Sequence, residues 1–229
     1  MQIAMITGAS RGLGRALALA LADQGWSLIV DARGEAALAE AADEIRSRLA
    51  PGARLTPIAG DVARPEHRRA LIAAAEELGG LDLLVNNASV LGPSPQPRLA
   101  DYPLAVLRDV YEVNLIAPLG LIQDALPVLR RSPTGRILNV TSDASVEPYE
   151  GWGGYGSSKA ALDHVSAILA AEEPGLRVWA VDPGDMRTQL HQEAFPGEDI
   201  SDRPAPEVVV PALLALIGSD QSSGRVRAA

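Results

Sequence analysis

The sequence of 229 residues contains no cysteine. This absence excludes disulfide bonds, zinc sites built on thiolates and cysteine nucleophiles. Histidine is scarce too. The three histidines, His67, His164 and His191, lack the spacing of metal ligands, so we expect no metal site. We expect His67 and His164 on helix surfaces, whereas His191 follows in a later loop and either reaches a substrate or is solvated there.

Aromatic side chains and positive charge are also in short supply. Aromatic residues make up 3% of the chain, with a single phenylalanine, so the core must be packed from aliphatic side chains. Lysine and arginine number 20 against 29 aspartates and glutamates, which gives a formal net charge of -9. A protein that binds nucleic acid usually presents a basic face, and this balance therefore argues against such a partner.

We find no apolar stretch of the length that spans a membrane. The segment 1–6 is too short for the core of a signal peptide, and it runs straight into a glycine-rich segment. We therefore expect a soluble, cytoplasmic protein that has no membrane partner.

Short apolar runs alternate with longer amphipathic segments along the whole chain. The runs predict strands at 3–7, 28–32, 55–59, 83–86, 136–141, 178–182 and 224–227, and the segments predict helices at 13–24, 35–49, 66–78, 104–129, 155–171 and 207–217. With 47% hydrophobic residues the chain can fill one sizeable core. We predict an α/β fold of one domain over residues 1–229, with a doubly wound parallel sheet between two layers of helices.

A glycine loop separates the first predicted strand from the first predicted helix. Gly8, Gly12 and Gly14 allow a tight turn there, and the helix that follows offers free N–H groups to a phosphate. The spacing differs from the Gly-x-Gly-x-x-Gly of common dinucleotide folds. The position of the loop nevertheless favours dinucleotide binding in a Rossmann-type domain over an ordinary turn.

Tyr155 and Lys159 stand four residues apart on a predicted helix, and Ser142 precedes them by thirteen residues. Residues four apart share one helix face, so the ammonium can lie near the phenol. A free tyrosine has a pKa of about 10, and a nearby cation lowers it toward that of a useful proton donor and base. By itself, however, such a pair is more often an ordinary solvated one.

Seven motifs occur together in the order and spacing of one family: Thr7-Gly8 with Gly12-Leu13-Gly14, Asp61-Val62, Asn86-Asn87-Ala88, Asn114, Ser142, Tyr155 with Lys159, and Pro183-Gly184 with Thr188. On these motifs the chain resembles a classical short-chain dehydrogenase/reductase over about residues 1–190. Ser89 departs from the pattern, since the family usually has glycine at that position.

The resemblance implies four catalytic residues. Tyr155 would be the general acid in reduction and the base in oxidation, and Ser142 would hydrogen-bond the substrate oxygen. Lys159 would lower the pKa of Tyr155 and bind the nicotinamide ribose, and Asn114 would hold a water that links Lys159 to solvent. The resemblance assigns the following residues to cofactor binding: Gly8, Ser10, Arg11, Gly12, Leu13, Gly14, Arg33, Asp61, Val62, Asn87, Ala88, Tyr155, Lys159, Pro183, Gly184 and Thr188.

The end of the second strand bears on the choice of dinucleotide. The family's NAD-selecting acid would stand at Ala32, while Arg33 and Arg11 stand where members that prefer NADP carry basic residues. A guanidinium can bind a phosphate bidentately, which favours NADP(H). Asp31 keeps NAD open, because a shift of one residue would turn it into the NAD-selecting acid.

We therefore expect an NADP(H)-dependent oxidoreductase that reduces a ketone or aldehyde, with the reverse oxidation also possible. An NAD-dependent alcohol dehydrogenase and a non-catalytic NADP-binding sensor or scaffold are the alternatives.

In this family residues 188–206 form the substrate lid, which is short here, and Tyr149, Trp152, Met186 and Phe195 lie in segments that line the pocket. Helices 104–129 and 155–171 pair between subunits in the family, so we expect a homodimer or homotetramer, the dimer being favoured by the short last strand.

Overall fold

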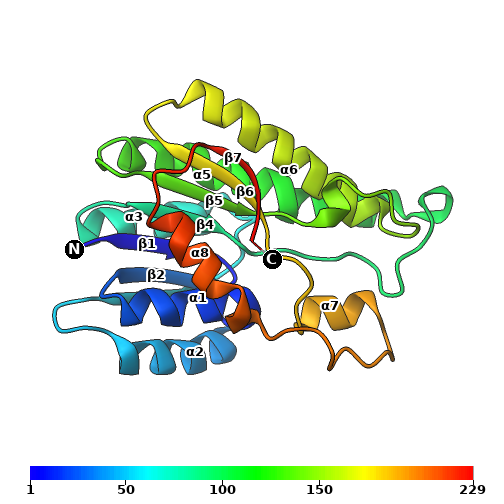
Figure 1. Cartoon of the computed structure of the whole chain (residues 1–229), viewed down its shortest axis with the longest axis horizontal. Coiled ribbons are helices and arrows are strands. Elements are labelled where there is room, and N and C mark those ends of the chain that lie inside the picture. The colour runs from blue at the N-terminus through cyan, green and yellow to red at the C-terminus, as the bar shows by residue number, and fades with distance from the viewer. Residues whose placement is uncertain (229) are drawn as a thin grey trace.

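Seven parallel strands form one sheet in the computed structural model, and the structure describes residues 1–228 (Figure 1). The strands are β1 (Ile3–Ile6), β2 (Ser27–Ala32), β3 (Leu55–Ala59), β4 (Leu83–Asn86), β5 (Arg136–Val140), β6 (Arg177–Asp182) and β7 (Gly224–Arg227). Their order is β3-β2-β1-β4-β5-β6-β7, so the winding direction reverses between β1 and β4. The predicted doubly wound sheet is confirmed, and such a sheet binds ligands at the carboxyl ends of its strands, where this reversal occurs.

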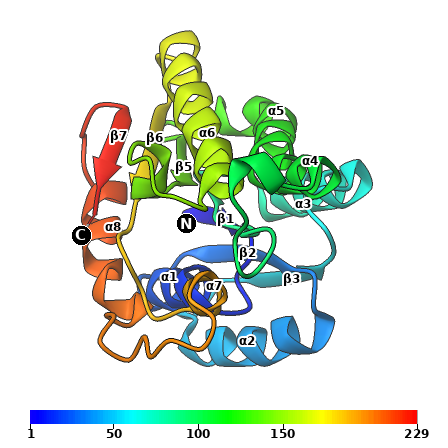
Figure 2. The same ribbon diagram turned by 90° about the vertical axis from the view of Figure 1, so that its right-hand side faces the viewer.

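Helices cover both faces of the sheet (Figure 2). One face carries α1 (Gly12–Asp23), α2 (Glu35–Arg48) and α8 (Val210–Ile217), and the other carries α3 (Pro65–Leu78), α5 (Ala117–Leu129) and α6 (Gly153–Glu172). Alternate residues of β1 supply the two cores, since Ala4 and Ile6 pack on the first face and Met5 packs on the second. Every residue of β1 and β4 is buried, which explains their continuous apolar runs.

Residues 104–129 form three consecutive pieces rather than the uniform helix we expected. α4 (Leu104–Tyr111) is followed by a π-helical turn at Glu112–Ile116 and then by α5. A π-helical turn holds one more residue than an α-helical turn and occurs frequently at functional sites. Here the turn carries the buried Asn114. The apolar pattern of the sequence runs through this turn, so it predicted the helix without the change in winding.

The same segment, Leu104–Leu129, is long and apolar enough to cross a membrane by length and composition alone. Our expectation that no apolar stretch reaches this length is therefore wrong for this segment. Its apolar side chains include Leu121, Ile122 and Leu129, which are buried in the second core against the sheet. This packing accounts for the hydropathy of the segment.

The predicted lid, residues 188–206, contains a short helix, α7 (Gln189–Ala194), that the sequence did not predict. Thr188 caps it, because its Oγ1 accepts a hydrogen bond of 3.2 Å from the main-chain N–H of His191. A helix of six residues is too short to show a periodic apolar pattern. Short 3-10 turns lie at Leu99–Asp101, Asp143–Ser145 and Pro206–Val208.

Candidate active site

A cleft of about 950 Å³ opens at the carboxyl ends of the strands. Its lining joins the glycine loop after β1 to the segments that follow β2, β4, β5 and β6. The predicted site residues that line it are Gly8, Ser10, Arg11, Gly12, Leu13, Arg33, Asp61, Val62, Asn87, Ala88, Ser142, Tyr155, Lys159, Pro183, Gly184 and Thr188. Gly14 and Asn114 do not line the cleft: Gly14 packs against the glycine loop, and Asn114 is buried beside Ser158.

The glycine loop has the backbone geometry that the sequence predicted. Gly8 and Gly12 have φ angles of 67° and 56°, in the left-handed region that side chains disfavour. A Cβ on Gly14 would lie 2.5 Å from both the Gly8 oxygen and the Asn87 amide nitrogen, so Gly14 lets α1 pack closely against the loop. The Asn87 side chain also donates to the Thr7 oxygen at 2.8 Å. This cradle fits a pyrophosphate at the start of α1.

A buried contact between Asp31 and His67 supports the glycine loop. The Asp31 carboxylate accepts a hydrogen bond of 2.8 Å from the Gly8 main-chain N–H and lies 2.9 Å from His67 Nε2. Burial raises the pKa of Asp31, and the bonds from His67 and Gly8 oppose that rise. The expected surface position of His67 is wrong, because its ring is buried against Gly60, where a Cβ would approach it to 2.1 Å.

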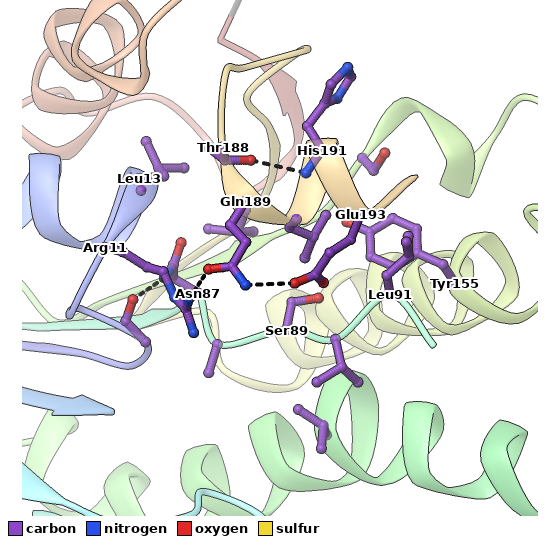
Figure 3. Close-up of a pocket in the computed structure, with 18 of the residues that line it drawn as sticks. Arg11, Leu13, Asn87, Ser89, Leu91, Tyr155, Thr188, Gln189, His191 and Glu193 are labelled. Carbon is purple, nitrogen blue, oxygen red and sulfur yellow. Dashed lines mark hydrogen bonds between the residues drawn. The ribbon is translucent and has the colours of Figure 1, made fainter. Parts of the chain in front are cut away.

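Two arginines that were predicted to bind the cofactor line the cleft. Arg33 follows Ala32 at the end of β2 and is exposed. Arg11 hydrogen-bonds the side chain of Gln189 on α7, and Gln189 donates in turn to Glu193 at 2.8 Å (Figure 3). The lid helix is thus connected to the glycine loop through side chains.

Tyr155 and Lys159 meet at the opposite end of the cleft, both buried on α6. The ammonium nitrogen lies 5.6 Å from the centroid of the phenol ring and donates to the Val140 main-chain oxygen at 2.8 Å. Ser142 follows β5 and caps the next turn by accepting from the Ala144 N–H at 3.2 Å. The structure therefore brings the three residues together around one point of the cleft.

Asn114 ties three elements together through its side chain. Its Oδ1 accepts hydrogen bonds from Ser89 Oγ at 3.1 Å and from the Val90 N–H at 2.9 Å. Its Nδ2 donates to the Val90 oxygen at 2.9 Å and to Ser158 Oγ at 3.0 Å. An amide has two donors and two acceptor lone pairs, so the side chain is saturated. Only the main chain of Asn114 is left to hold the water that we predicted.

Burial shifts the proton affinities of the catalytic pair in opposite directions. It raises the pKa of Tyr155, and Asp143 and Asp182 add to the rise, whereas hydrogen bonds from Ser89 and Ser142 oppose it. It lowers the pKa of Lys159 to about 8, against the effect of Asp163. Our expectation of a lowered Tyr155 pKa is therefore not met in this structure, because desolvation by burial is the largest effect on the phenol.

Aromatic rings form one wall of the cleft beside Tyr155. Trp152 lines the cleft and packs edge-on against Tyr155, with ring centroids 5.8 Å apart. Phe195 lies behind Trp152 at 6.0 Å and packs on the ring of His191 at 4.9 Å. His191 lines the cleft, but its ring is turned away from Tyr155 (Figure 3). His164 is exposed on α6, as expected.

Three residues at the site were missed by the sequence reasoning. Ser89 hydrogen-bonds Asn114, and Asp143 accepts a hydrogen bond of 2.9 Å from Ser142 Oγ. Arg225 on β7 donates to the Ser142 main-chain oxygen at 3.1 Å. The departure from the family's glycine was a visible signal for Ser89. The other two contacts depend on the fold, because Arg225 lies 83 positions from Ser142.

Known proteins resemble this chain in sequence and in fold. The sequence profile of the short chain dehydrogenase family matches residues 2–199. Sepiapterin reductase of Mus musculus is 35% identical over 202 residues, which cover 84% of this chain and 77% of that protein. A solved structure from Pseudomonas syringae, assigned as a short chain dehydrogenase, has a TM-score of 0.92 and 34% identity, and the match covers 100% of this chain and 94% of that chain. A protein from Shigella flexneri with the same assignment, solved with NADP, has a TM-score of 0.91 and 29% identity, with 99% and 96% covered.

Proposed function

Because the chain belongs to the short-chain dehydrogenase family, we propose that it is an NADP(H)-dependent reductase that converts a ketone or aldehyde to an alcohol. The observation that carries the proposal is the convergence of Ser142, Tyr155 and Lys159 at one end of a cleft whose other end is a glycine loop. A relative named as a reductase and a neighbouring structure that contains NADP support it.

The geometry supports a division of tasks among the residues. Bound NADPH would supply a hydride to the carbonyl carbon of the substrate. Tyr155 would give its proton to the carbonyl oxygen, where negative charge develops, and Ser142 would hydrogen-bond the same oxygen. The raised pKa keeps the Tyr155 phenol protonated at neutral pH, as an acid requires. The Lys159 cation, 5.6 Å from the ring, would stabilise the phenolate that remains.

The environment of β2 supports NADP(H) over NAD(H). An NAD-selecting acid accepts hydrogen bonds from the adenosine ribose. The buried Asp31 carboxylate already accepts a hydrogen bond from the Gly8 N–H and contacts His67, so it is not free to bind a ribose. The exposed guanidinium of Arg33 lines the cleft near this point, together with Arg11. Two guanidinium groups suit the charge of a 2′-phosphate.

The first experiment follows consumption of NADPH with a panel of small aldehydes and ketones, for the wild type and Tyr155→Phe. We expect the substitution to lower kcat by about three orders of magnitude, the middle of the range for a positioned proton donor. NADPH binding, measured by calorimetry, should change little. Normal turnover by Tyr155→Phe would contradict the mechanism, and NADPH binding without any turnover of the panel would favour a sensor.

The cofactor is tested separately by comparing kcat/KM for NADPH and NADH in the wild type and in Arg33→Ala. We expect NADPH to be preferred, and the preference to fall about tenfold in the variant because a charged hydrogen bond to phosphate is lost. Equal values for the two cofactors in the wild type would overturn the NADP assignment while leaving the reductase assignment intact.

A further inference from the structure

A carboxylate lies directly beside the predicted catalytic serine. Asp143 Oδ1 accepts hydrogen bonds from Ser142 Oγ at 2.9 Å and from the Ala144 N–H at 2.8 Å. Its Oδ2 accepts from the Tyr149 hydroxyl at 3.0 Å. Three donors from three neighbouring residues thus fix the position of the carboxylate, and the side chain also lines the cleft.

These three partners are a hydroxyl, a main-chain amide and a phenol, all of them neutral. They orient the carboxylate but do not compensate its charge. The charge of Asp143 acts on the proton donor. It adds to the effect of burial, and both raise the pKa of Tyr155. A substrate whose carbonyl oxygen meets both Tyr155 and Ser142 must therefore place its neighbouring atoms in the field of Asp143.

Within the described residues the neighbouring carboxylates have cationic partners, since Arg225 donates to Asp182 Oδ2 at 3.2 Å and Arg203 lies 3.6 Å from Asp185, whereas Asp143 has none within 4 Å. Asp182 also raises the pKa of Tyr155, and Asp185 lines the cleft after β6. The Lys159 ammonium donates to the Val140 main-chain oxygen at 2.8 Å and lies 5.6 Å from the centroid of the Tyr155 ring. Arg187 also lines the cleft, but its guanidinium reaches the main chain of the lid at Ser201, 3.5 Å away.

Trp152 gives the same place an apolar, flat boundary. Its ring packs edge-on against Tyr155 at 5.8 Å and at 6.3 Å from the ring of Tyr149, whose hydroxyl binds Asp143. A group attached to the substrate carbonyl would meet an indole surface on one side and a carboxylate on the other. That combination suits an aromatic or apolar group and repels an anionic one.

We propose that Asp143 is a specificity-determining residue that makes this site reject carbonyl compounds carrying a carboxylate or phosphate and favour neutral or cationic aromatic ones. The inference rests on the proposed reductase function, whose active end it describes. Ser142 must also share its hydroxyl proton between Asp143 and the substrate oxygen, so the carboxylate keeps the serine oriented within the cleft.

The test compares substrates that differ in charge but keep the same aldehyde: 4-formylbenzoate, its methyl ester and 4-(trimethylammonio)benzaldehyde. The quantity is the ratio of kcat/KM for the charged aldehyde to that for the ester, measured with NADPH, so that intrinsic reactivity cancels between variants. For Asp143→Asn we expect the ratio for the anion to rise about tenfold and the ratio for the cation to fall by a similar factor, as expected for charges a few ångströms apart at a partly solvated site.

Two control variants separate charge from shape. Asp143→Glu keeps the charge and should retain the wild-type ratios even if its turnover is lower. Glu150→Gln removes a carboxylate from the same segment, where Glu150 is exposed and pairs with Arg98 at 2.9 Å, and it should also leave the ratios unchanged. Unchanged ratios in Asp143→Asn, or an equal change in Glu150→Gln, would overturn the assignment of Asp143.

A binding measurement keeps the inference testable if none of the aldehydes is reduced, which would count against the proposed function. Benzoate and benzamide are then titrated into the protein with NADPH present, and their affinities are compared by calorimetry. We expect the wild type to bind benzamide more tightly than benzoate. The ratio of the two affinities should fall about tenfold in Asp143→Asn. The same preference in both proteins would overturn the role of Asp143.

Discussion

Burial is the largest influence on both Tyr155 and Lys159, and it shifts their pKa values in opposite directions although the two side chains share one face of α6. The phenol becomes a weaker acid, and the ammonium becomes a stronger one with a pKa of about 8. As the pH rises, the lysine therefore loses its proton before the tyrosine does. The charge that would stabilise the phenolate formed during reduction is present below this pKa and is lost above it.

We expect kcat/KM for carbonyl reduction to decline as the pH rises through about 8, following deprotonation of Lys159. Asp163→Asn should move this decline to lower pH, because the Asp163 carboxylate raises the pKa of Lys159. The measurement is a pH profile of the wild type and the variant with one neutral aldehyde. A profile that stays flat well above this pH, or a decline that moves upward in the variant, would contradict the account.

Some properties of single residues could be predicted from the sequence and others could not. The positions of Ser142, Tyr155 and Lys159 were predictable, since their spacing and order are visible along the chain. The burial of His67 was not, because its partner Asp31 lies 36 residues away on another element. A lone histidine on an amphipathic helix carries no sign of which carboxylate the fold will bring to it.

At the scale of elements, the short strand β7 does more than close the sheet. Arg225 on this strand donates from Nη2 to the Ser142 oxygen at 3.1 Å and to Asp182 Oδ2 at 3.2 Å, and from Nε to Asp163 Oδ2 at 3.1 Å. Asp182 in turn accepts from the Gly184 N–H at 3.0 Å. One guanidinium thus connects the ends of β5 and β6 with α6.

We expect Arg225→Ala to lower kcat about tenfold with a smaller change in KM, because the position of Ser142 relaxes while the cleft stays open. Arg225→Lys should recover part of the loss by keeping one charged donor. The control is Arg227→Ala, which removes a second exposed arginine from the same strand. Equal losses in the Arg225 and Arg227 variants would mean that β7 contributes only to stability.

The elements themselves were predicted well wherever the apolar pattern decides the structure. Each of the seven predicted strands is present, and the buried central strands, such as β1, β2 and β4, leave the uninterrupted apolar runs that predict them. The π-helical turn at Glu112–Ile116 and the helix α7 were missed. Both are set by side-chain contacts, through Asn114 and Thr188, that a periodic pattern does not express.

At the scale of the whole molecule, apolar side chains remain exposed on the helices that face away from the sheet. Ile116 in the π-helical turn and Ile168 on α6 are 47% and 45% exposed, and the two elements are in contact. Exposed apolar side chains on neighbouring elements are a feature of interfaces between proteins. We propose that this face, defined by Ile116 and Ile168, pairs with a second copy of the chain to form a dimer.

Light scattering should give the mass of a dimer for the wild type, and Ile168→Glu should shift the protein toward monomer, since a charge would be buried at the contact. Val208→Glu is the matched control, because Val208 is 67% exposed on a different part of the surface. A monomeric wild type, or equal shifts in both variants, would rule this face out as the interface.

The contact between Arg11 and the lid has a consequence for nucleotide binding. Arg11 hydrogen-bonds Gln189, which is held in turn by Glu193, so the guanidinium that faces the cofactor end also tethers α7 (Figure 3). A guanidinium that engages a phosphate has fewer donors left for a neutral amide. We propose that a nucleotide phosphate would compete with the Gln189 amide for the Arg11 guanidinium, so that binding of the nucleotide would change how firmly α7 is held.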